Sequence, residues 1–451
     1  MKKLLFLLAI FCTLEANAQP YSISFAGTGL STVKVQNLSS GLIVNLNAGD
    51  VLRLSAATGI PKVNNIKSSG IKVYPNPMTD KSTLEIHSPV AGDAIITVFD
   101  MTGKVLTQFK GYVENYKQEF SLSGIKNGLH IINVQGNGYQ FSEKILSNGK
   151  SNGTAIIARE SNNTHAVNEK KTIEDSKGVQ AIVDMAYNSG ERLIFTAVSG
   201  NNRTVMTSIP TTDNTVTFTF TECKDGDNNY YPVVQINTQF WMVENLKTTN
   251  YSNGTPIPLV NNTTSWAALT DTSKAYCWYN DDIANKATYG ALYTWAAAMN
   301  GAAGTNNNPS GIQGVCPTDW HLPSDAEWTQ MENYLADNGY NYDGTTGGGI
   351  DKIAKSLTST SGWNSSSNTG AVGNTDYPAY RNKSGFTALP GGSRSTIGPF
   401  YSIGNFGYWW SAKGSTSTAY YRSMGYDYSS ETSEDNRTSK KLGFSVRCIK
   451  D

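Results

Sequence analysis

The sequence predicts a mainly β, multi-domain fold, in which β-sandwich modules are followed by an α+β domain with two helices. Its 451 residues suffice for roughly three domains of about 150 residues each. The 42 glycines and the hydrophobic content of 39% are typical of short strands joined by many turns. All nine tryptophans lie at or beyond Trp241, which indicates that residues 222–451 form a separate domain.

The N-terminus is typical of an export signal. Lys2 and Lys3 precede an apolar run over residues 4–14, and the sequence Ala-Asn-Ala at 16–18 is an A-x-A cleavage pattern. We therefore expect residues 1–18 to be a signal peptide and the mature protein to be extracellular or on the outer cell surface. The apolar run is too short to span a bilayer, and we expect no transmembrane helix elsewhere.

Two segments that flank residues 67–150 are similar to each other. NLNAGDVLRLSAATGI (45–60) and YNSGERLIFTAVSGNN (187–202) share the order of turn, glycine and acid, alternating strand, and glycine. Neither fragment alone can bury much of a core. We therefore expect residues 19–66 and 151–221 to form one discontinuous β-sandwich, with two separate small units as the alternative.

Residues 67–150 have the strand pattern of a unit of their own. In AIITVFDMTGKVL (94–106) side chains alternate in a strand that ends at an Asp-Met-Thr-Gly turn, and YPNP (74–77) precedes it. Together these motifs resemble the C-terminal sorting domain of the type IX secretion system of Bacteroidetes, a small β-sandwich. The resemblance implies the type IX secretion machinery as a partner. That signal acts at the extreme C-terminus, whereas residues 151–451 follow here, so we expect a retained structural or spacer module.

The C-terminal domain begins with a turn and a hairpin. Alternation over residues 233–241 predicts the β-hairpin. Asp225 and Asp227 flank Gly226 as in a calcium loop, but the twelve-residue frame and its closing glutamate are missing. We therefore favour a plain turn, in which Gly226 takes a positive φ and aspartate caps its own backbone.

Two helices are predicted in this domain. In ATYGALYTWAAAMNG (287–301), apolar residues at i, i+3, i+4 and i+7 form one stripe, and the final glycine ends it. Ser324 and Glu327 form a capping box that begins the second helix. Its core face carries Trp328, Met331 and Leu335. From Phe386 onward the pattern predicts short strands.

Four cysteines remain after the signal peptide, and an oxidising compartment permits two disulfides in any of three pairings. They are Cys223, Cys277, Cys316 and Cys448. Their spacing contains no C-x-x-C motif, which argues against structural zinc. We expect a Cys316–Cys448 bond, which would tie the last strand to the loop before the second helix.

Six motifs spread over residues 222–451 carry a second resemblance. They are WMVENLKT, YGALYTW, GVCPTDWHLPSDAEW, FTALPGGSR, YWWSA and GFSVRCIKD. In this order they are similar to the Fibrobacter succinogenes major paralogous domain, and some are distantly similar to sulfatase-modifying factors. The resemblance implies a C-type-lectin-like fold with two helices, a small sheet and long irregular loops.

Several function classes are disfavoured, and we expect no enzyme. The 36 basic and 36 acidic residues balance, so no net field attracts nucleic acid. The four histidines lie in different segments, and only His321 is in the C-terminal domain, which disfavours a catalytic triad or a histidine-rich metal site. Sulfatase-modifying enzymes use two cysteines and copper, but no matching cysteine segment is present. We expect no catalytic residue, metal or cofactor.

The remaining hypothesis is binding of an extracellular glycan or protein by the loops of the C-terminal domain. Aromatic side chains in or beside loops rich in Gly, Ser and Asn could stack on sugar rings. The candidates are Trp363, Arg394, Tyr401, Trp410 and Tyr421. Because neighbours on a strand alternate faces, at least one of Trp409 and Trp410 is expected in the core. The alternatives are a structural component of the cell envelope and an oxidase related to the sulfatase-modifying factors.

Overall fold

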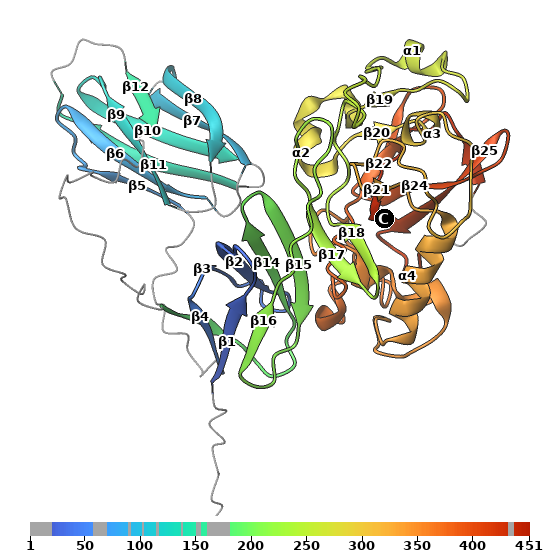
Figure 1. Ribbon diagram of the computed structural model, residues 1–451. Helices are drawn as coiled ribbons and strands as arrows, with labels where there is room; N and C mark the ends of the chain where they lie inside the picture. Colours follow the sequence, from blue (N-terminus) through green and yellow to red (C-terminus); the bar gives the residue numbers. More distant parts are fainter. Residues whose placement is uncertain are drawn as a thin grey trace, which may run out of the picture. The chain divides into compact units, whose positions relative to one another are not determined.

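Strands dominate the architecture in the computed structural model (Figure 1), which confirms the mainly β prediction. The structure describes residues 20–56, 70–88, 92–101, 103–113, 117–136, 139–149, 155–159, 181–431 and 437–451. The predicted signal peptide lies outside these residues. The chain divides into two compact units: residues 58–176 form one, and residues 1–57 with 177–451 form the other.

The unit of residues 58–176 consists of two four-stranded sheets that share one apolar core. Their orders are β12-β9-β6-β5 and β11-β10-β7-β8. The strands are β5 (Gly70–Tyr74), β6 (Lys81–His87), β7 (Gly92–Asp100), β8 (Val105–Val113), β9 (Lys117–Ser123), β10 (Gly128–Gly136), β11 (Tyr139–Ser147) and β12 (Ile156–Arg159). In β7, Ile96 and Val98 are fully buried as the alternation predicted, but Thr97 between them is buried as well.

In the other unit, strands from residues 21–55 pair with strands from residues 182–217, and together they enclose one apolar core. One sheet has the order β13-β4-β1-β16, in which β1 pairs with β16 and β13 with β4 in parallel. The facing strands are β3, β2, β14 and β15. The bounds are β1 (Tyr21–Ala26), β2 (Thr32–Asn37), β3 (Ile43–Asn47), β4 (Val51–Ser55), β13 (Ile182–Ala186), β14 (Leu193–Ser199), β15 (Asn202–Ser208) and β16 (Asn214–Thr217).

The second of these sheets continues into the C-terminal region without interruption. It has eight strands in the order β21-β27-β18-β17-β15-β14-β2-β3. The junction is a parallel pairing of β15 with β17 (Pro232–Ile236). The new strands are β17, β18 (Gln239–Met242), β21 (Trp320–His321) and β27 (Ile449–Lys450). The predicted hairpin is β17–β18, with Asn237 at φ 55° in its turn.

The capping box is present as predicted. Ser324 accepts a hydrogen bond from the backbone N–H of Glu327, and the Glu327 carboxylate accepts one from the backbone N–H of Ser324, at the start of α4 (Asp325–Asp337). The core face of α4 packs Trp328, Met331 and Leu335, all fully buried. These contacts fix the helix against β17, β18 and the strands that follow.

The first predicted helix is wrong as a continuous element. Residues 287–301 contain the end of α2 (Lys286–Tyr289), then β20 (Leu292–Tyr293), then α3 (Trp295–Ala298). Gly290 breaks the pattern at φ 74°, and a Cβ there would lie 2.7 Å from the Leu246 carbonyl oxygen. Two residues further on, β20 pairs with β19 (Tyr276–Cys277). Tertiary pairing overrides the apolar stripe.

A five-stranded sheet completes the C-terminal region, in the order β23-β22-β24-β25-β26. Its strands are β22 (Gly391–Arg394), β23 (Phe400–Ile403), β24 (Phe406–Gly414), β25 (Thr418–Gly425) and β26 (Arg437–Ser439). Both faces of β24 are covered, because Trp409 and Trp410 are fully buried in two different core clusters. The remaining helices are short: α1 (Thr263–Ala267), α5 (Ala354–Leu357) and 3₁₀ turns at Tyr279–Asp281, Ile283–Asn285, Gly349–Lys352 and Pro378–Tyr380.

A disulfide joins Cys316 and Cys448, as the sequence predicts. It ties the residue before β27 to the loop before β21. The other two cysteines, Cys223 and Cys277, are buried thiols. The second disulfide that the cysteine count permits is therefore not formed between Cys223 and Cys277. Burial raises the pKa of Cys277 to about 12, so this thiol is protonated at neutral pH.

Candidate functional site

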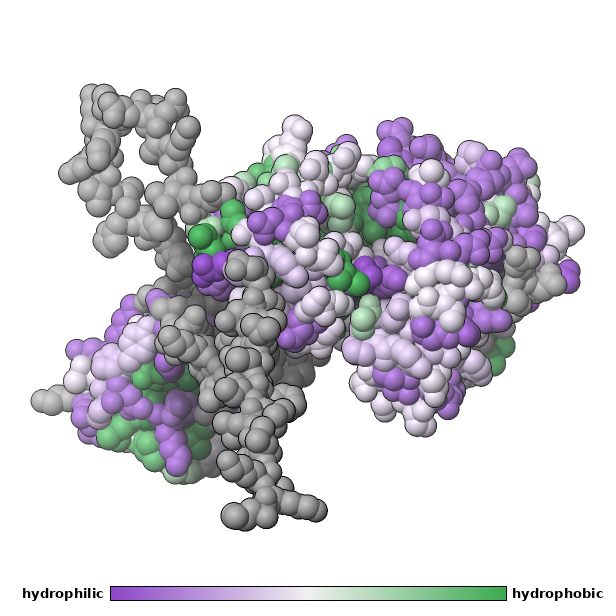
Figure 2. All heavy atoms as spheres, turned by 90° about the horizontal axis from the view of Figure 1, so that it is seen from below, coloured by the Kyte–Doolittle hydropathy of each residue, from purple (hydrophilic) through white to green (hydrophobic). Residues whose placement is uncertain are grey.

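The face of the molecule shown in Figure 2 offers few extended apolar areas to a partner. On this face, hydrophilic and near-neutral residues cover most of the described surface, and hydrophobic residues form small groups. A binding site is therefore better sought in a hollow whose polar groups can hold a ligand.

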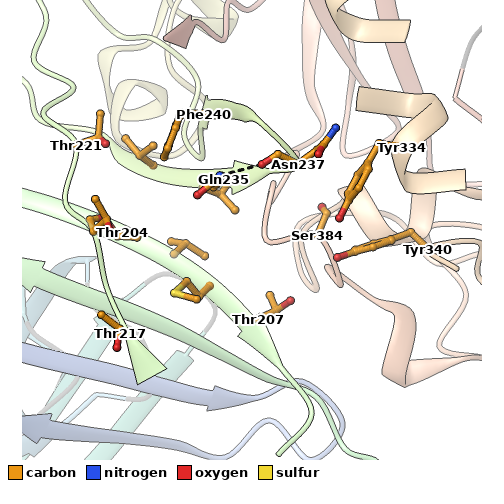
Figure 3. A pocket seen from close by; sticks show the side chains of 15 residues that line it. Thr204, Thr207, Thr217, Thr221, Gln235, Asn237, Phe240, Tyr334, Tyr340 and Ser384 are labelled. Carbon is orange, nitrogen blue, oxygen red and sulfur yellow. Dashed lines mark hydrogen bonds between the residues drawn. The ribbon is translucent and has the colours of Figure 1, made fainter. Parts of the chain in front are cut away.

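Such a hollow opens where β15 and β17 separate. The two strands pair only from Arg203 opposite Pro232 to Val205 opposite Val234, and then they diverge. The space beyond this point is a cleft of 410 Å³ (Figure 3), which we name the threonine cleft. It is lined by Thr204, Val205, Met206, Thr207, Thr217, Thr219, Thr221, Val233, Val234, Gln235, Asn237, Phe240, Tyr334, Tyr340 and Ser384.

One wall of the threonine cleft comes from a strict alternation in the sequence TVTFTFT (215–221). Val216 and Phe218 are buried in the core between the two sheets, whereas Thr217 and Thr219 are exposed on the opposite side. Thr204 of β15 donates a hydrogen bond from Oγ1 to the Thr219 carbonyl oxygen at 2.8 Å, which holds this wall against the sheet. The period of two places three threonines, at 217, 219 and 221, along the cleft.

The hairpin and the end of α4 supply amide and aromatic groups. Gln235 lies opposite Phe240 across the β17–β18 ladder, and its Nε2 donates to the Asn237 carbonyl oxygen at 2.9 Å. Tyr334 and Tyr340 lie with ring centroids 6.4 Å apart, and in Figure 3 both hydroxyls point toward Ser384. Burial raises the pKa of Tyr340, so its phenol is neutral and can donate a hydrogen bond.

Two cations, Lys383 and Arg192, contact residues that line the threonine cleft. Lys383 donates from Nζ to the Gly339 carbonyl oxygen at 2.6 Å and lies 4.6 Å from the centroid of the Tyr340 ring. Arg192 donates to the Ala379 carbonyl oxygen and to Thr207 Oγ1, each at 3.3 Å. Burial and the neighbouring Arg192 lower the pKa of Lys383 to about 8. The lining itself carries no charged side chain.

Comparison with protein families places two known domains on the chain. Residues 234–450 match the Fibrobacter succinogenes major domain, and residues 72–148 match the secretion system C-terminal sorting domain. The chain carries both domains. No curated protein and no solved structure matches it. The sorting domain indicates a secreted or cell-surface protein, and within the described ranges no helix is long and apolar enough to cross a membrane.

The Fibrobacter major domain buries two of the five residues that the sequence suggested for ligand binding, and for these the expectation is wrong. Arg394 is 0% exposed, and its guanidinium contacts Asp281 at 2.7 and 3.1 Å between the rings of Trp266 and Phe400. Trp410 is 0% exposed and donates from Nε1 to the Tyr293 carbonyl oxygen at 2.8 Å. Neither has surface to offer a ligand.

The other three candidates for ligand binding in this domain lie outside the threonine cleft. Tyr401 is 52% exposed on β23. Trp363 is half-buried and donates from Nε1 to the Ala388 carbonyl oxygen at 3.2 Å, and Tyr421 packs on Phe444 with ring centroids 5.1 Å apart. None of the three lines the threonine cleft. The sequence reading missed the cleft, although the alternation in TVTFTFT was visible.

The aspartate turn at the start of the domain is a structural feature. Asp225 is buried, and its carboxylate accepts hydrogen bonds from the backbone N–H groups of Asp227 and Asn229, each at 2.9 Å. Its other oxygen accepts from the Asn229 amide and the Tyr231 hydroxyl. The positive φ lies at Asn228 and not at Gly226, so that detail of the predicted turn is wrong. Across the described residues, no group of three His, Cys, Asp or Glu is arranged to hold a metal ion.

His321 is held between two carboxylates in the Fibrobacter major domain. Its Nε2 lies 2.7 Å from Glu327 Oε1 and its Nδ1 lies 2.5 Å from Asp451 Oδ1. Burial lowers the pKa of His321, but the hydrogen bonds and charges of Glu327 and Asp451 outweigh burial, so the pKa lies above its usual value. Since the same Glu327 carboxylate closes the capping box, His321 fixes the start of α4.

This arrangement predicts a pH-dependent contribution to stability. A raised pKa in the folded state stabilises the protein fully below the unfolded value of about 6.5, and the contribution is lost as pH rises through the folded pKa. The difference in free energy of unfolding between wild type and His321→Gln should therefore shrink from pH 5.5 to pH 8.5. Asp451→Asn should weaken this trend, measured by urea unfolding. A difference that does not change with pH would contradict the assignment.

Proposed function

We propose that this protein is a secreted or cell-surface, non-enzymatic binding protein that holds an extracellular glycan or protein segment in the threonine cleft. The observation that carries the proposal is the cleft itself: an open space of 410 Å³ between β15 and the β17–β18 hairpin. Its volume is within the range of ligand pockets, roughly 300–1,000 Å³. β15 and the β17–β18 hairpin belong to one eight-stranded sheet, and such rigid support favours specific binding.

The cleft also contains hydrogen-bonding groups that are available to a ligand. Among the described residues, the hydroxyls of Thr217 and Thr219 and the phenols of Tyr334 and Tyr340 have no hydrogen bond within the protein that would occupy them. Groups of this kind on a rigid wall can exchange bound water for a ligand with little loss of conformational entropy. The non-enzymatic part of the proposal is supported by the buried thiols and by the structural role of His321.

A cleft-filling variant tests this function. Met206 lines the cleft and is 37% exposed, so Met206→Trp should fill the space without disturbing the core. Met101, 59% exposed in the sorting domain, provides the matched control Met101→Trp. On glycan and peptide arrays the full chain should show signals that Met206→Trp loses and Met101→Trp keeps. Arrays without any signal, or signals that Met206→Trp retains, would refute the proposal.

A further inference from the structure

The fifteen residues of the threonine cleft share one chemical property. Each is either neutral and polar or apolar, and no carboxylate, ammonium, guanidinium or imidazole is among them. A charged ligand would therefore lose water without gaining a partner of opposite charge, which is costly. Lys383 and Arg192 are not themselves lining residues: Lys383 donates to the Gly339 carbonyl oxygen, and Arg192 donates to the Ala379 carbonyl oxygen and to the lining residue Thr207.

The polar groups of the cleft are of the kind that recognises hydroxyls. Hydroxyl groups of Thr, Ser and Tyr both donate and accept, and the amides of Gln235 and Asn237 offer the two functions side by side. A ligand with many hydroxyls can satisfy such groups in either direction. Three aromatic rings, those of Phe240, Tyr334 and Tyr340, add apolar faces beside these groups.

A peptide strand is less well accommodated. It would have to pair with the free edges of β15 and β17 beyond Val205 and Val234, as in strand addition. The loop at residues 383–385 already packs against the point where β15 and β17 separate. Thr207 donates from Oγ1 to the Lys383 carbonyl oxygen at 2.6 Å, and a Cβ on Gly385 would lie 3.2 Å from both valines.

We infer that the ligand of the threonine cleft is an uncharged oligosaccharide, whose hydroxyls bind the threonine wall and whose ring packs against an aromatic side chain. This inference rests on the proposed function and specifies its ligand class. Thr217 and Thr219 form hydrogen bonds with the sugar hydroxyls. Gln235 of the hairpin binds the sugar from another side, and Tyr334 and Tyr340 lie at the far end of the cleft.

Calorimetric titration of the full chain with defined oligosaccharides tests the inference. The probes are neutral fragments of four to six residues from glucans, xylan and mannan, together with oligogalacturonides of the same length and an uncharged peptide. At least one neutral fragment should bind, and the oligogalacturonides should bind at least about tenfold more weakly, because a desolvated carboxylate costs more than 1.4 kcal/mol.

Threonine-to-valine variants locate the interaction. The double variant Thr217→Val, Thr219→Val removes two hydroxyls but keeps the shape and the strand propensity, and should weaken binding about tenfold or more. Thr215→Val lies in the same run but outside the cleft and should leave binding unchanged. A peptide or acidic sugar that binds with sensitivity to Met206→Trp would overturn the ligand class and leave the proposed function standing. Absence of any cleft-dependent ligand would overturn both.

Discussion

Replacing Arg422 with methionine is expected to lower the free energy of unfolding of the C-terminal region by about 3–5 kcal/mol, the cost of removing one partner from a buried ion pair. The guanidinium is 0% exposed, and its Nε lies 2.6 Å from Glu332 Oε1. It also contacts both Asp325 and the Thr329 hydroxyl. Methionine leaves the carboxylates of Asp325 and Glu332 buried with less compensation, and Glu431 lies close enough to interact with them.

Tryptophan fluorescence during urea unfolding measures this effect in the right place, because all nine tryptophans lie at or beyond Trp241. The matched control is Lys352→Met. Lys352 is paired with Asp343 at 2.7 Å on the surface of the same region, and an exposed pair contributes little. The control should unfold close to wild type. Equal midpoints for Arg422→Met and Lys352→Met would show that the buried cluster is not stabilising.

Loss of the Cys316–Cys448 disulfide is expected to cost about 5 kcal/mol in the chain-entropy model, since the bonded residues are 132 positions apart. The bond closes a loop that contains α4 and the five-stranded sheet, so its removal enlarges the unfolded ensemble. Both cysteines are buried. We therefore expect the double variant Cys316→Ala, Cys448→Ala to unfold at a markedly lower urea concentration.

A thiol reductant provides the control for this prediction. Dithiothreitol should destabilise the wild type and leave the double variant unchanged. Cys277→Ala, which removes a buried thiol but keeps the disulfide, should remain sensitive to the reductant. A wild type whose unfolding midpoint is insensitive to complete reduction would contradict the role given to this bond.

Local patterns in the sequence predicted the elements whose contacts are local. The capping box at Ser324 predicted the start of α4, and the alternation over residues 94–106 predicted β7 and its turn. The hairpin β17–β18 is of the same kind. The disulfide joins residues that are distant in the sequence, but it was also predicted correctly, because each cysteine lies beside a recognisable element. In each case the residues that decide the structure lie within a few positions of one another or are marked by their chemistry.

The errors arose where distant segments decide the outcome. Residues 287–301 have a helical stripe, but Gly290 and the pairing of Leu292–Tyr293 with β19 divide the segment. Arg394 and Trp410 stand in sequence that is typical of loops and strands at a surface, yet layers contributed by other segments cover them. The residues adjacent to Arg394 and Trp410 in the sequence do not indicate that distant segments cover these two side chains.

The threonine cleft was missed for the same reason. Its walls come from β15, the run 215–221, the hairpin and the end of α4, and Tyr340 is more than a hundred positions from Thr219 in the sequence. The alternation in the run was a usable signal for one exposed face. Nothing in the neighbouring residues indicated that this face borders a hollow, which depends on where β15 and β17 separate.

The central claim is that the threonine cleft holds an uncharged oligosaccharide. Its most direct measurement is a crystal structure of the full chain with the neutral oligosaccharide that binds most tightly. We expect density for the sugar between β15 and the β17–β18 hairpin, with hydroxyls in hydrogen-bond contact with Thr217 and Thr219 and one ring against Tyr334 or Tyr340. A sugar bound on the loop surface around Tyr401, with the threonine cleft empty, would contradict the account.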